Sequence, residues 1–188
     1  LAVRRQRQMC IRDSLERFKE CWCKNFEIKL MSLITISLGS NIEPQLNLEK
    51  AIHEIAKFAA LKKTSKIYKS KSMGFEGNDF LNQVILCEVK VDLEETYRKL
   101  KKIEKEMGRV KNVNKFSDRL IDLDLLTFND EISEGKITLP HKDILKYSFV
   151  LVPFAEIYPE FVHPVNQKSI ETLLKEKNSF LSEVEKIN

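Results

Sequence analysis

Apolar positions along this chain recur at two different periods, and the two periods predict a mixture of strands and helices. The segment SLITISL (32–38) is rich in β-branched residues and leads into Gly39-Ser40-Asn41, which predicts a strand followed by a turn. Pro44 suits the first turn of a helix. The apolar positions that follow recur at helical spacing, and they are Leu48, Ile52, Ile55 and Ala59. Residues 32–59 are therefore predicted as a strand and a helix.

Two further strands are predicted in the next part of the chain. KKTSKIYKSKS (62–72) is polar and predicts an edge strand, whereas MGFEGND (73–79) contains two glycines and predicts a loop. FLNQVILCEVKV (80–91) alternates between apolar and other positions, which predicts a strand. The residues expected on its apolar face are Ile85, Cys87, Val89 and Val91.

A second helix is predicted after Asp92, because Asp92 and Glu95 have the spacing of a capping box. Gly108 predicts the C-terminal end of this helix. Its apolar face is expected to consist of Leu93, Tyr97, Leu100, Ile103 and Met107. The basic segment RVKNVNKFSD (109–118) has no apolar periodicity and predicts a loop.

The C-terminal third begins with RLIDLDLLTF (119–128), which predicts a strand that turns towards KITLP (136–140) and forms a hairpin with it. Residues 143–158 predict a helix interrupted by Pro153, and 168–176 predict a last helix. The resulting order is βαββαβ, followed by a hairpin and helices. It predicts the α+β class, with a ferredoxin-like, mainly antiparallel sheet and helices packed on it.

Composition indicates a globular protein, since 32% of the 188 residues are charged and 43% are hydrophobic. No apolar run approaches the roughly 18 residues that a membrane helix needs. The net charge of +4 would favour a nucleic-acid partner, but residues 1–30 hold eight of the 32 basic residues and four of the 28 acidic ones. Residues 31–188 are therefore formally neutral, and we expect neither a nucleic-acid nor a membrane partner.

The N-terminal excess of arginine has an unusual source. RRQRQMCIRD (4–13) resembles the translation of the adapter that transposase-based sequencing libraries attach to DNA ends, and Ser14 extends the match. A targeting peptide is the alternative, but such peptides are poor in acidic residues and this segment is not. We therefore expect residues 1–30 to be a non-native extension, with 4–14 adapter-like, and residues 31–188 to form a single domain.

The cysteines follow the same division, because three of the four lie within the first thirty residues and Cys87 alone lies beyond them. Cys21 and Cys23 have no second pair at the spacing of a zinc site. An isolated cysteine in an alternating apolar segment is typical of a buried, reduced thiol. The cysteine usage therefore predicts a cytoplasmic protein.

Candidate chemistry centres on Asp122 and Asp124, which are two apart on a predicted strand and so share one face. Like charges this close need a neutralising partner, and paired carboxylates suit hard divalent cations such as Mg²⁺. Residues 31–188 contain three arginines, and two of them, Arg109 and Arg119, flank the aspartates and could bind phosphate bidentately. The pattern indicates a magnesium–polyphosphate site; two solvated aspartates beside a basic loop remain the alternative.

Several ordered motifs resemble the family of 6-hydroxymethyl-7,8-dihydropterin pyrophosphokinases. They are ISLGSN (36–41), FLN (80–82), EKEMGRVK (104–111), RLIDLDLL (119–126), LPHKD (139–143) and PFAEIYPEFVHP (153–164). The resemblance implies transfer of the diphosphate of ATP to the hydroxymethyl group of the pterin, with release of AMP, in folate biosynthesis. It also implies two Mg²⁺ ions and small-molecule substrates, and we expect a monomer.

The resemblance assigns roles to individual residues. The catalytic residues it implies are Arg109, Arg119, Asp122 and Asp124, of which the two aspartates hold the metal. The ATP-binding residues are Glu104, Arg109, Lys111, Arg119, Leu125, Lys136, Thr138 and His141. The pterin-binding residues are Ser70, Ser72, Gly74, Phe80, Asn82, Phe116, Asp122 and Phe149. Phe80 and Phe149 would stack on the two faces of the pterin, although both could equally be core residues.

The chain also departs from the pattern of this family. Members often have tryptophan where Phe116 stands, tyrosine where Phe80 stands, and arginine at Lys111 and Tyr147. These departures affect details of ATP binding. Two other functions stay open on the residues alone: another magnesium-dependent phosphotransferase on the same fold, and a non-catalytic ferredoxin-like module that binds RNA.

Overall fold

The computed structural model describes residues 31–72, 77–108 and 119–187. Met31–Asn188 is one compact unit. The predictions for the N-terminal extension and for the basic loop 109–118 therefore lie outside the described residues. In the part of the chain that is described, no helix is long and apolar enough to cross a membrane.

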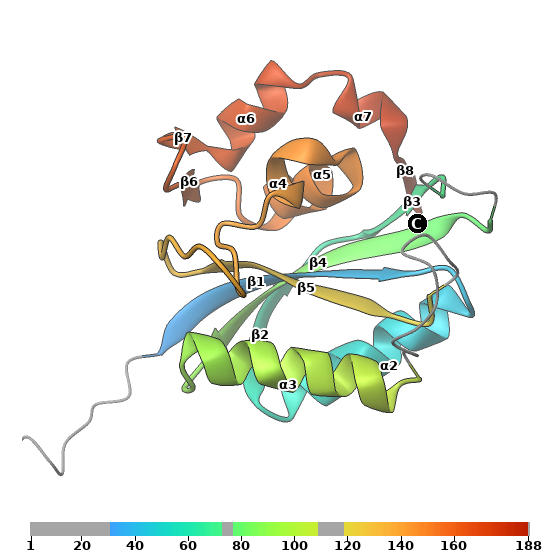
Figure 1. The fold of residues 1–188 in the computed structure, drawn as a ribbon. Coiled ribbons are helices and arrows are strands. Elements are labelled where there is room, and N and C mark those ends of the chain that lie inside the picture. The colour runs from blue at the N-terminus through green and yellow to red at the C-terminus, as the bar shows by residue number, and fades with distance from the viewer. Residues whose placement is uncertain (1–30, 73–76, 109–118, 188) are drawn as a thin grey trace, which may run out of the picture. The chain divides into compact units, whose positions relative to one another are not determined.

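The described part of Met31–Asn188 is built around a main antiparallel sheet with helices on both of its faces (Figure 1). The strands are β1 (Ser32–Ser40), β2 (Ala59–Thr64), β3 (Ile67–Ser70), β4 (Phe80–Val89), β5 (Asp122–Phe128), β6 (Val162–His163), β7 (Lys168–Ser169) and β8 (Glu185–Ile187). The helices are α2 (Pro44–Ala56), α3 (Leu93–Glu106), α4 (Asp143–Lys146), α5 (Ser148–Ile157), α6 (Ile170–Glu176) and α7 (Phe180–Glu183).

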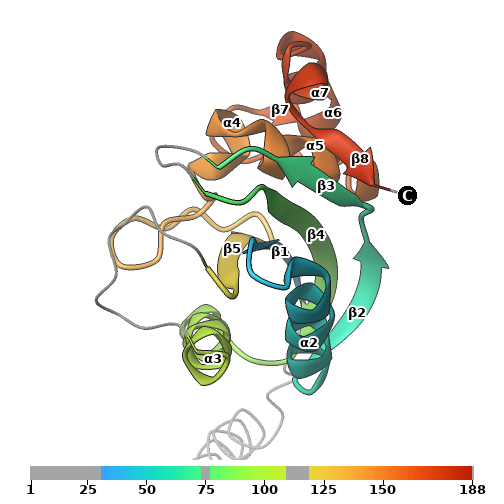
Figure 2. The same cartoon turned by 90° about the vertical axis from the view of Figure 1, so that its right-hand side faces the viewer.

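The main sheet has the strand order β5-β1-β4-β3-β8, and β2 also pairs with β4. Every one of these pairings is antiparallel. β6 and β7 form a separate two-stranded sheet. Figure 2 shows α2 and α3 on one side of the main sheet and α4 to α7 on the other. The α+β class and the antiparallel sheet are thereby confirmed.

Two apolar cores, one on each face, explain why the central strands have continuous apolar sequences. In β4, Ile85 and Cys87 pack into the core beneath α2 and α3, whereas Val84 and Leu86 pack into the core beneath α5 and α6. Alternate side chains of a strand point to opposite faces, so a sheet covered on both sides buries nearly every residue. Each fully buried aliphatic side chain stabilises the fold by about 1.5–3 kcal/mol.

The predicted ends of α3 are confirmed. The backbone N–H of Glu95 donates to Oδ1 of Asp92 (2.8 Å), so Asp92 caps the helix. Gly108 has φ +100°, a conformation that glycine adopts without strain, and it follows the last turn of the helix. α2 begins at Pro44 as predicted.

The segments on either side of β4 differ from the prediction. Ala59 does not end α2 but begins β2. Residues 62–72 contain parts of two strands, β2 and β3, and β3 is not an edge strand because β8 pairs with its outer side. A long-range pairing with the C-terminal residues cannot be recognised from the local polar pattern, so the prediction of an edge strand was wrong for β3.

The hairpin predicted between 119–128 and 136–140 is also absent: these residues are described, and 136–140 form no strand. The backbones of Ser133 and Leu139 instead exchange two hydrogen bonds (3.0 and 2.9 Å) and close a loop on itself. His141 N–H then donates to the carbonyl of Leu126 (2.9 Å), which attaches the end of this loop to β5.

The helical region 143–158 is interrupted at Tyr147 rather than at Pro153. Tyr147 is extended (φ −123°, ψ 132°) and separates α4 from α5, and Pro153 lies inside α5. Proline removes one backbone donor, but burial of neighbours such as Leu151 and Phe154 against the sheet outweighs that loss. The last predicted helix begins at Ile170 instead of Lys168, because the Ser169 hydroxyl accepts from Thr172 N–H and caps it.

Acid should weaken this fold through His163. The side chain of His163 is 3% exposed, its Nδ1 accepts a hydrogen bond from Asn166 N–H (3.3 Å), and burial lowers its pKa. As the pH falls through the unfolded pKa of about 6.5, the unfolded chain therefore binds more protons than the folded protein. The free energy of unfolding decreases as a result. We expect the free energy of unfolding, measured by urea titration, to decrease between about pH 7.5 and pH 5.5 in the parent protein. The decrease should be smaller in His163→Gln.

The matched control is His53→Gln, since His53 is exposed on α2. This control should keep the pH dependence of the parent protein. Equal pH dependence in His163→Gln and the parent would contradict the prediction.

Candidate active site

The two aspartates lie on one face of β5, as their spacing predicts. Leu123 and Leu125 alternate with them and are buried in the core beneath α2 and α3, whereas Asp122 and Asp124 are half-buried on the other side of the strand. In the pairing with β1, Asp122 lies opposite Gly39 and Asp124 opposite Ser37. The carboxylates therefore stand on a strand whose position is fixed by the core behind it.

Arg119 contacts the first of these aspartates, with its Nη1 in an ion pair with Oδ2 of Asp122. The backbone of Arg119 is held in turn by Asn41, at the end of β1. Arg119 N–H donates to Oδ1 of Asn41 (2.6 Å), and Asn41 N–H donates to the carbonyl of Arg119 (3.1 Å). Asn41, the last residue of ISLGSN, thus positions the backbone of Arg119, three residues before Asp122.

A lysine and a glutamate of α3 bind the backbone of β5, which is the outermost strand on its side of the sheet. Leu123 N–H donates to Oε1 of Glu104 (2.8 Å), and Nζ of Lys101 donates to the carbonyl of Leu123 (2.8 Å). The same ammonium group donates to Oε1 of Glu104 (2.9 Å). The two side chains therefore provide hydrogen-bond partners for the backbone N–H and C=O of Leu123, as a neighbouring strand would do for an edge strand.

Asp124 lies between charged groups from two elements. Nζ of Lys101 is 3.5 Å from its Oδ1. On the other side, ligand atoms of Asp124, His141 and Asp143 all lie within 4.8 Å of one another. Burial raises the pKa of Asp124, and the negative charge of Asp122 raises it further. A cation near Asp124 is therefore favourable, and carboxylate oxygens are the donors that Mg²⁺ prefers.

Glu104 and Lys101 form an ion pair in which the carboxylate is buried and the lysine side chain is partly exposed. Glu104 is 2% exposed, and its pKa is raised because burial outweighs the nearby ammonium. For Lys101, burial acts to lower the pKa, but the charges of Asp124 and Glu104 outweigh it and the pKa is raised. Lys101 is therefore a charged group held among oxygen atoms.

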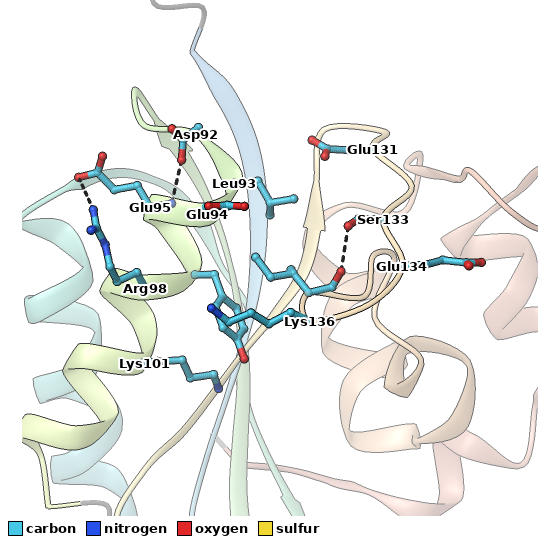
Figure 3. A pocket seen from close by; sticks show the side chains of 12 residues that line it. Asp92, Leu93, Glu94, Glu95, Arg98, Lys101, Glu131, Ser133, Glu134 and Lys136 are labelled. Carbon is cyan, nitrogen blue, oxygen red and sulfur yellow. Dashed lines mark hydrogen bonds and ion pairs between the residues drawn. The ribbon is translucent and has the colours of Figure 1, made fainter.

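A cavity of about 830 Å³ opens between the first half of α3 and the loop that follows β5. Its walls include Tyr97 and Ile137, and Figure 3 shows Lys101 on α3 and Lys136 on the facing loop directed towards the space between them. Acidic residues such as Glu94 and Glu134 also line it. The lining therefore combines a few apolar side chains, among them Leu93 and Ile137, with charged side chains of both signs, of which the acidic ones are the more numerous.

A second group of predicted residues gathers where β3 and β4 pair. Asn82 is 4% exposed, and its Nδ2 donates to Oγ of Ser70 (2.9 Å) and to the carbonyl of Tyr68 (3.3 Å). Phe80 lies opposite Ser70 in the strand pairing. The hydroxyl of Ser72 donates to the carbonyl of Gly77 (3.3 Å). The two hydrogen bonds of Nδ2, to Ser70 and Tyr68, hold the amide of Asn82 in one orientation.

The remaining predicted residues are placed as follows. The ring of Phe149 stacks on that of Tyr147, with centroids 4.9 Å apart and an interplanar angle of 16°. Leu125 packs in the core beneath α2 and α3, and the hydroxyl of Thr138 donates to the carbonyl of Gly135 (3.4 Å). Gly74, Arg109, Lys111 and Phe116 lie outside the described residues.

Three residues at this site were not predicted from the sequence, namely Asn41, Lys101 and Asp143. Asn41 and Asp143 occur inside the quoted motifs ISLGSN and LPHKD, so the motifs themselves were the available signal. Lys101 precedes Glu104 by three residues, the spacing of neighbours on a helix. Its contact with β5 depends on how α3 packs against the sheet.

Comparison with known proteins gives a consistent result. Residues 35–159 match the family described as 7,8-dihydro-6-hydroxymethylpterin-pyrophosphokinase (HPPK). The chain is 35% identical to the 2-amino-4-hydroxy-6-hydroxymethyldihydropteridine pyrophosphokinase of Aquifex aeolicus, over 75% of this chain and 89% of that protein. It is 34% identical to the protein of the same name from Synechocystis sp., over 75% of this chain and 74% of that protein.

Solved structures show the same fold. A crystal structure of Plasmodium falciparum HPPK-DHPS with bound pterin superposes with a TM-score of 0.68 at 15% sequence identity. The alignment covers 86% of this chain, which spans about half (49%) of the Plasmodium chain. At this identity the likeness concerns the arrangement of sheet and helices.

Proposed function

The chain belongs to the 7,8-dihydro-6-hydroxymethylpterin-pyrophosphokinase family, and we propose that it transfers diphosphate from ATP to the hydroxymethyl group of 6-hydroxymethyl-7,8-dihydropterin. The products are AMP and the pterin diphosphate, an intermediate of folate synthesis. The observation that carries the proposal is the pair Asp122 and Asp124 on one face of β5. Arg119 is bound to the first aspartate, and the cavity lined by Lys101 and Lys136 lies nearby.

Asp122 and Asp124 are the residues proposed to hold Mg²⁺, two ions in all. The donor set fits, because Asp122 and Asp124 offer hard carboxylate oxygens on one face of β5, and burial together with the negative charge of Asp122 raises the pKa of Asp124. Asp143 and His141 lie close enough to Asp124 to assist. When bound, the metal supplies positive charge that neutralises the ATP phosphates.

The protein's own groups position the two substrates. Arg119, Lys136 and His141 are proposed to bind phosphate oxygens, and the walls of the cavity are proposed to bind the nucleoside. Asn82, whose amide is oriented by Ser70, is proposed to hydrogen-bond the edge of the pterin ring. When both reactants are held in one complex, the reaction between them becomes effectively unimolecular. Its activation barrier is lower because the entropy of orienting the reactants is already lost on binding.

Some finer features remain proposals of the same kind. We propose that the sheet has the ferredoxin-like arrangement, since the order β5-β1-β4 with β2 and β3 beyond β4 fits a βαββαβ core. We also propose that residues 31–188 form a single catalytic domain that acts as a cytoplasmic monomer. Cys87, a buried free thiol, fits a reducing compartment.

The test is the identity of the nucleotide product. Incubation of the protein with Mg²⁺, ATP and the hydroxymethylpterin should give AMP, and omission of the pterin should reduce AMP to background. Production of ADP would instead indicate a different magnesium-dependent phosphotransferase. Absence of AMP from folded protein under saturating substrates would overturn the proposal.

A further inference from the structure

Both aspartates of the site already have a cation of the protein beside them. Arg119 pairs with Asp122, and Lys101 lies 3.5 Å from Asp124. The two cations differ in how they are held. Arg119 comes from the segment just before β5, whereas Lys101 comes from α3, a helix whose packing against the sheet is fixed by buried residues such as Leu100 and Ile103.

Three oxygen atoms lie close to the ammonium group of Lys101. They are Oε1 of Glu104 at 2.9 Å, the carbonyl of Leu123 at 2.8 Å and Oδ1 of Asp124 at 3.5 Å. An ammonium group has three donors, so these oxygens can occupy all of them. The side chain is 29% exposed, which leaves the charge partly shielded from solvent. Lys101 is therefore held beside Asp124 by contacts that do not involve a ligand.

The hydrogen-bond distances indicate that Lys101 is anchored by two contacts and affects Asp124 through a third, longer one. The contacts with Glu104 and Leu123 have the lengths of strong hydrogen bonds, and they anchor the ammonium group. The contact with Asp124 is longer, so its carboxylate experiences the positive charge while its oxygen atoms stay able to bind another ligand. A fixed charge at this distance weakens the attraction of the carboxylate for any other cation.

From this geometry we infer that Lys101 is a positioning residue that keeps free divalent cations away from Asp124 until nucleotide phosphates arrive. The inference rests on the proposed function, because only a metal that brings phosphate ligands offsets the repulsion by the ammonium group. Lys101 thus makes the binding of metal depend on the nucleotide.

The experiment measures Mn²⁺ binding to the protein without nucleotide, by counting free Mn²⁺ with electron paramagnetic resonance. Lys101→Gln removes the charge but keeps an amide donor for the carbonyl of Leu123. We expect this variant to bind Mn²⁺ about tenfold more tightly than the parent. Lys101→Arg keeps the charge and should bind Mn²⁺ as weakly as the parent protein does.

Lys102→Gln is the matched control, since Lys102 lies on the same helix, is exposed and pairs with Glu106 (3.5 Å). It removes the same charge and should change the Mn²⁺ affinity less than twofold. The double variant Lys101→Gln/Glu104→Gln protects against a folding defect, because its two amides can keep the hydrogen bonds to Leu123. It too should bind Mn²⁺ more tightly than the parent.

Three results would overturn the inference: no gain in affinity in either Lys101→Gln variant, an equal gain in Lys102→Gln, or an equal gain in Lys101→Arg. The Mn²⁺ comparison and the AMP assay can fail separately, so a failure of the inference is distinguishable from a failure of the proposed function. Parent protein that makes AMP while Lys101→Gln binds Mn²⁺ like the parent refutes only the role of Lys101. Parent protein that makes no AMP refutes the pyrophosphokinase activity, whatever the Mn²⁺ comparison gives.

Discussion

Asp124→Asn is expected to reduce AMP formation by about a thousandfold while the protein stays folded. The substitution keeps the size of the side chain and removes the negative charge on which the proposed metal site depends. It should not weaken the fold, because burial and Asp122 raise the pKa of Asp124. An acid whose pKa is raised on folding destabilises the folded state as the pH rises above its unfolded value of 3.8, and an amide is free of that cost.

The measurement is the initial rate of AMP release with both substrates saturating, alongside urea unfolding of each variant. Asp130→Asn is the control, since Asp130 is exposed in the turn directly after β5. It removes the same charge a few residues away and should keep the parent rate. If Asp124→Asn turned over ATP at a rate near that of the parent, the assignment of the carboxylate would be wrong.

The parts of this site that follow from local rules could be predicted from the sequence. The common face of Asp122 and Asp124 depends only on the two-residue period of a strand, and the burial of Leu123 on the other face follows with it. The cap at Asp92 and the helix end at Gly108 depend on residues within one turn of the helix. Neither requires knowledge of how the elements pack.

The parts that depend on packing could not be predicted. The sequence raised the question of what neutralises the aspartate pair, and the expected answer was metal and nucleotide. The structure shows that Arg119 and Lys101 already lie beside them. The hydrogen bond from Lys101 to the carbonyl of Leu123, which holds the lysine there, joins residues 22 positions apart in sequence, and it exists because α3 packs beside the edge of β5. No local pattern encodes that distance.

The same reasoning applies to the sheet edges. β3 resembled an edge strand because its sequence is polar, yet β8, more than 110 residues later, covers it. Tyr68 and Lys186 both contact Glu156 of α5, so the pairing of β3 with β8 is supported from a third element. A polar sequence in β3 is therefore compatible with a strand that is paired on both sides.

Glu104→Ala is expected to lower the free energy of unfolding by about 2–4 kcal/mol. Two costs add together in this variant. Leu123 N–H loses its acceptor at a buried position, and the ammonium of Lys101 loses its closest carboxylate. Glu104→Gln should lose much less, because an amide oxygen can still accept from Leu123 N–H. Urea titrations at neutral pH compare the three proteins.

Glu106→Ala is the control, since Glu106 is exposed on the same helix and its ion pair with Lys102 is 3.5 Å long. Removal of an exposed pair of this kind should cost at most about 1 kcal/mol. Equal losses in Glu104→Ala and Glu106→Ala would show that β5 does not depend on α3 for its edge contacts. A larger loss in Glu104→Ala would mean that the strand which carries both aspartates is held in place by the same helix that brings Lys101 to them.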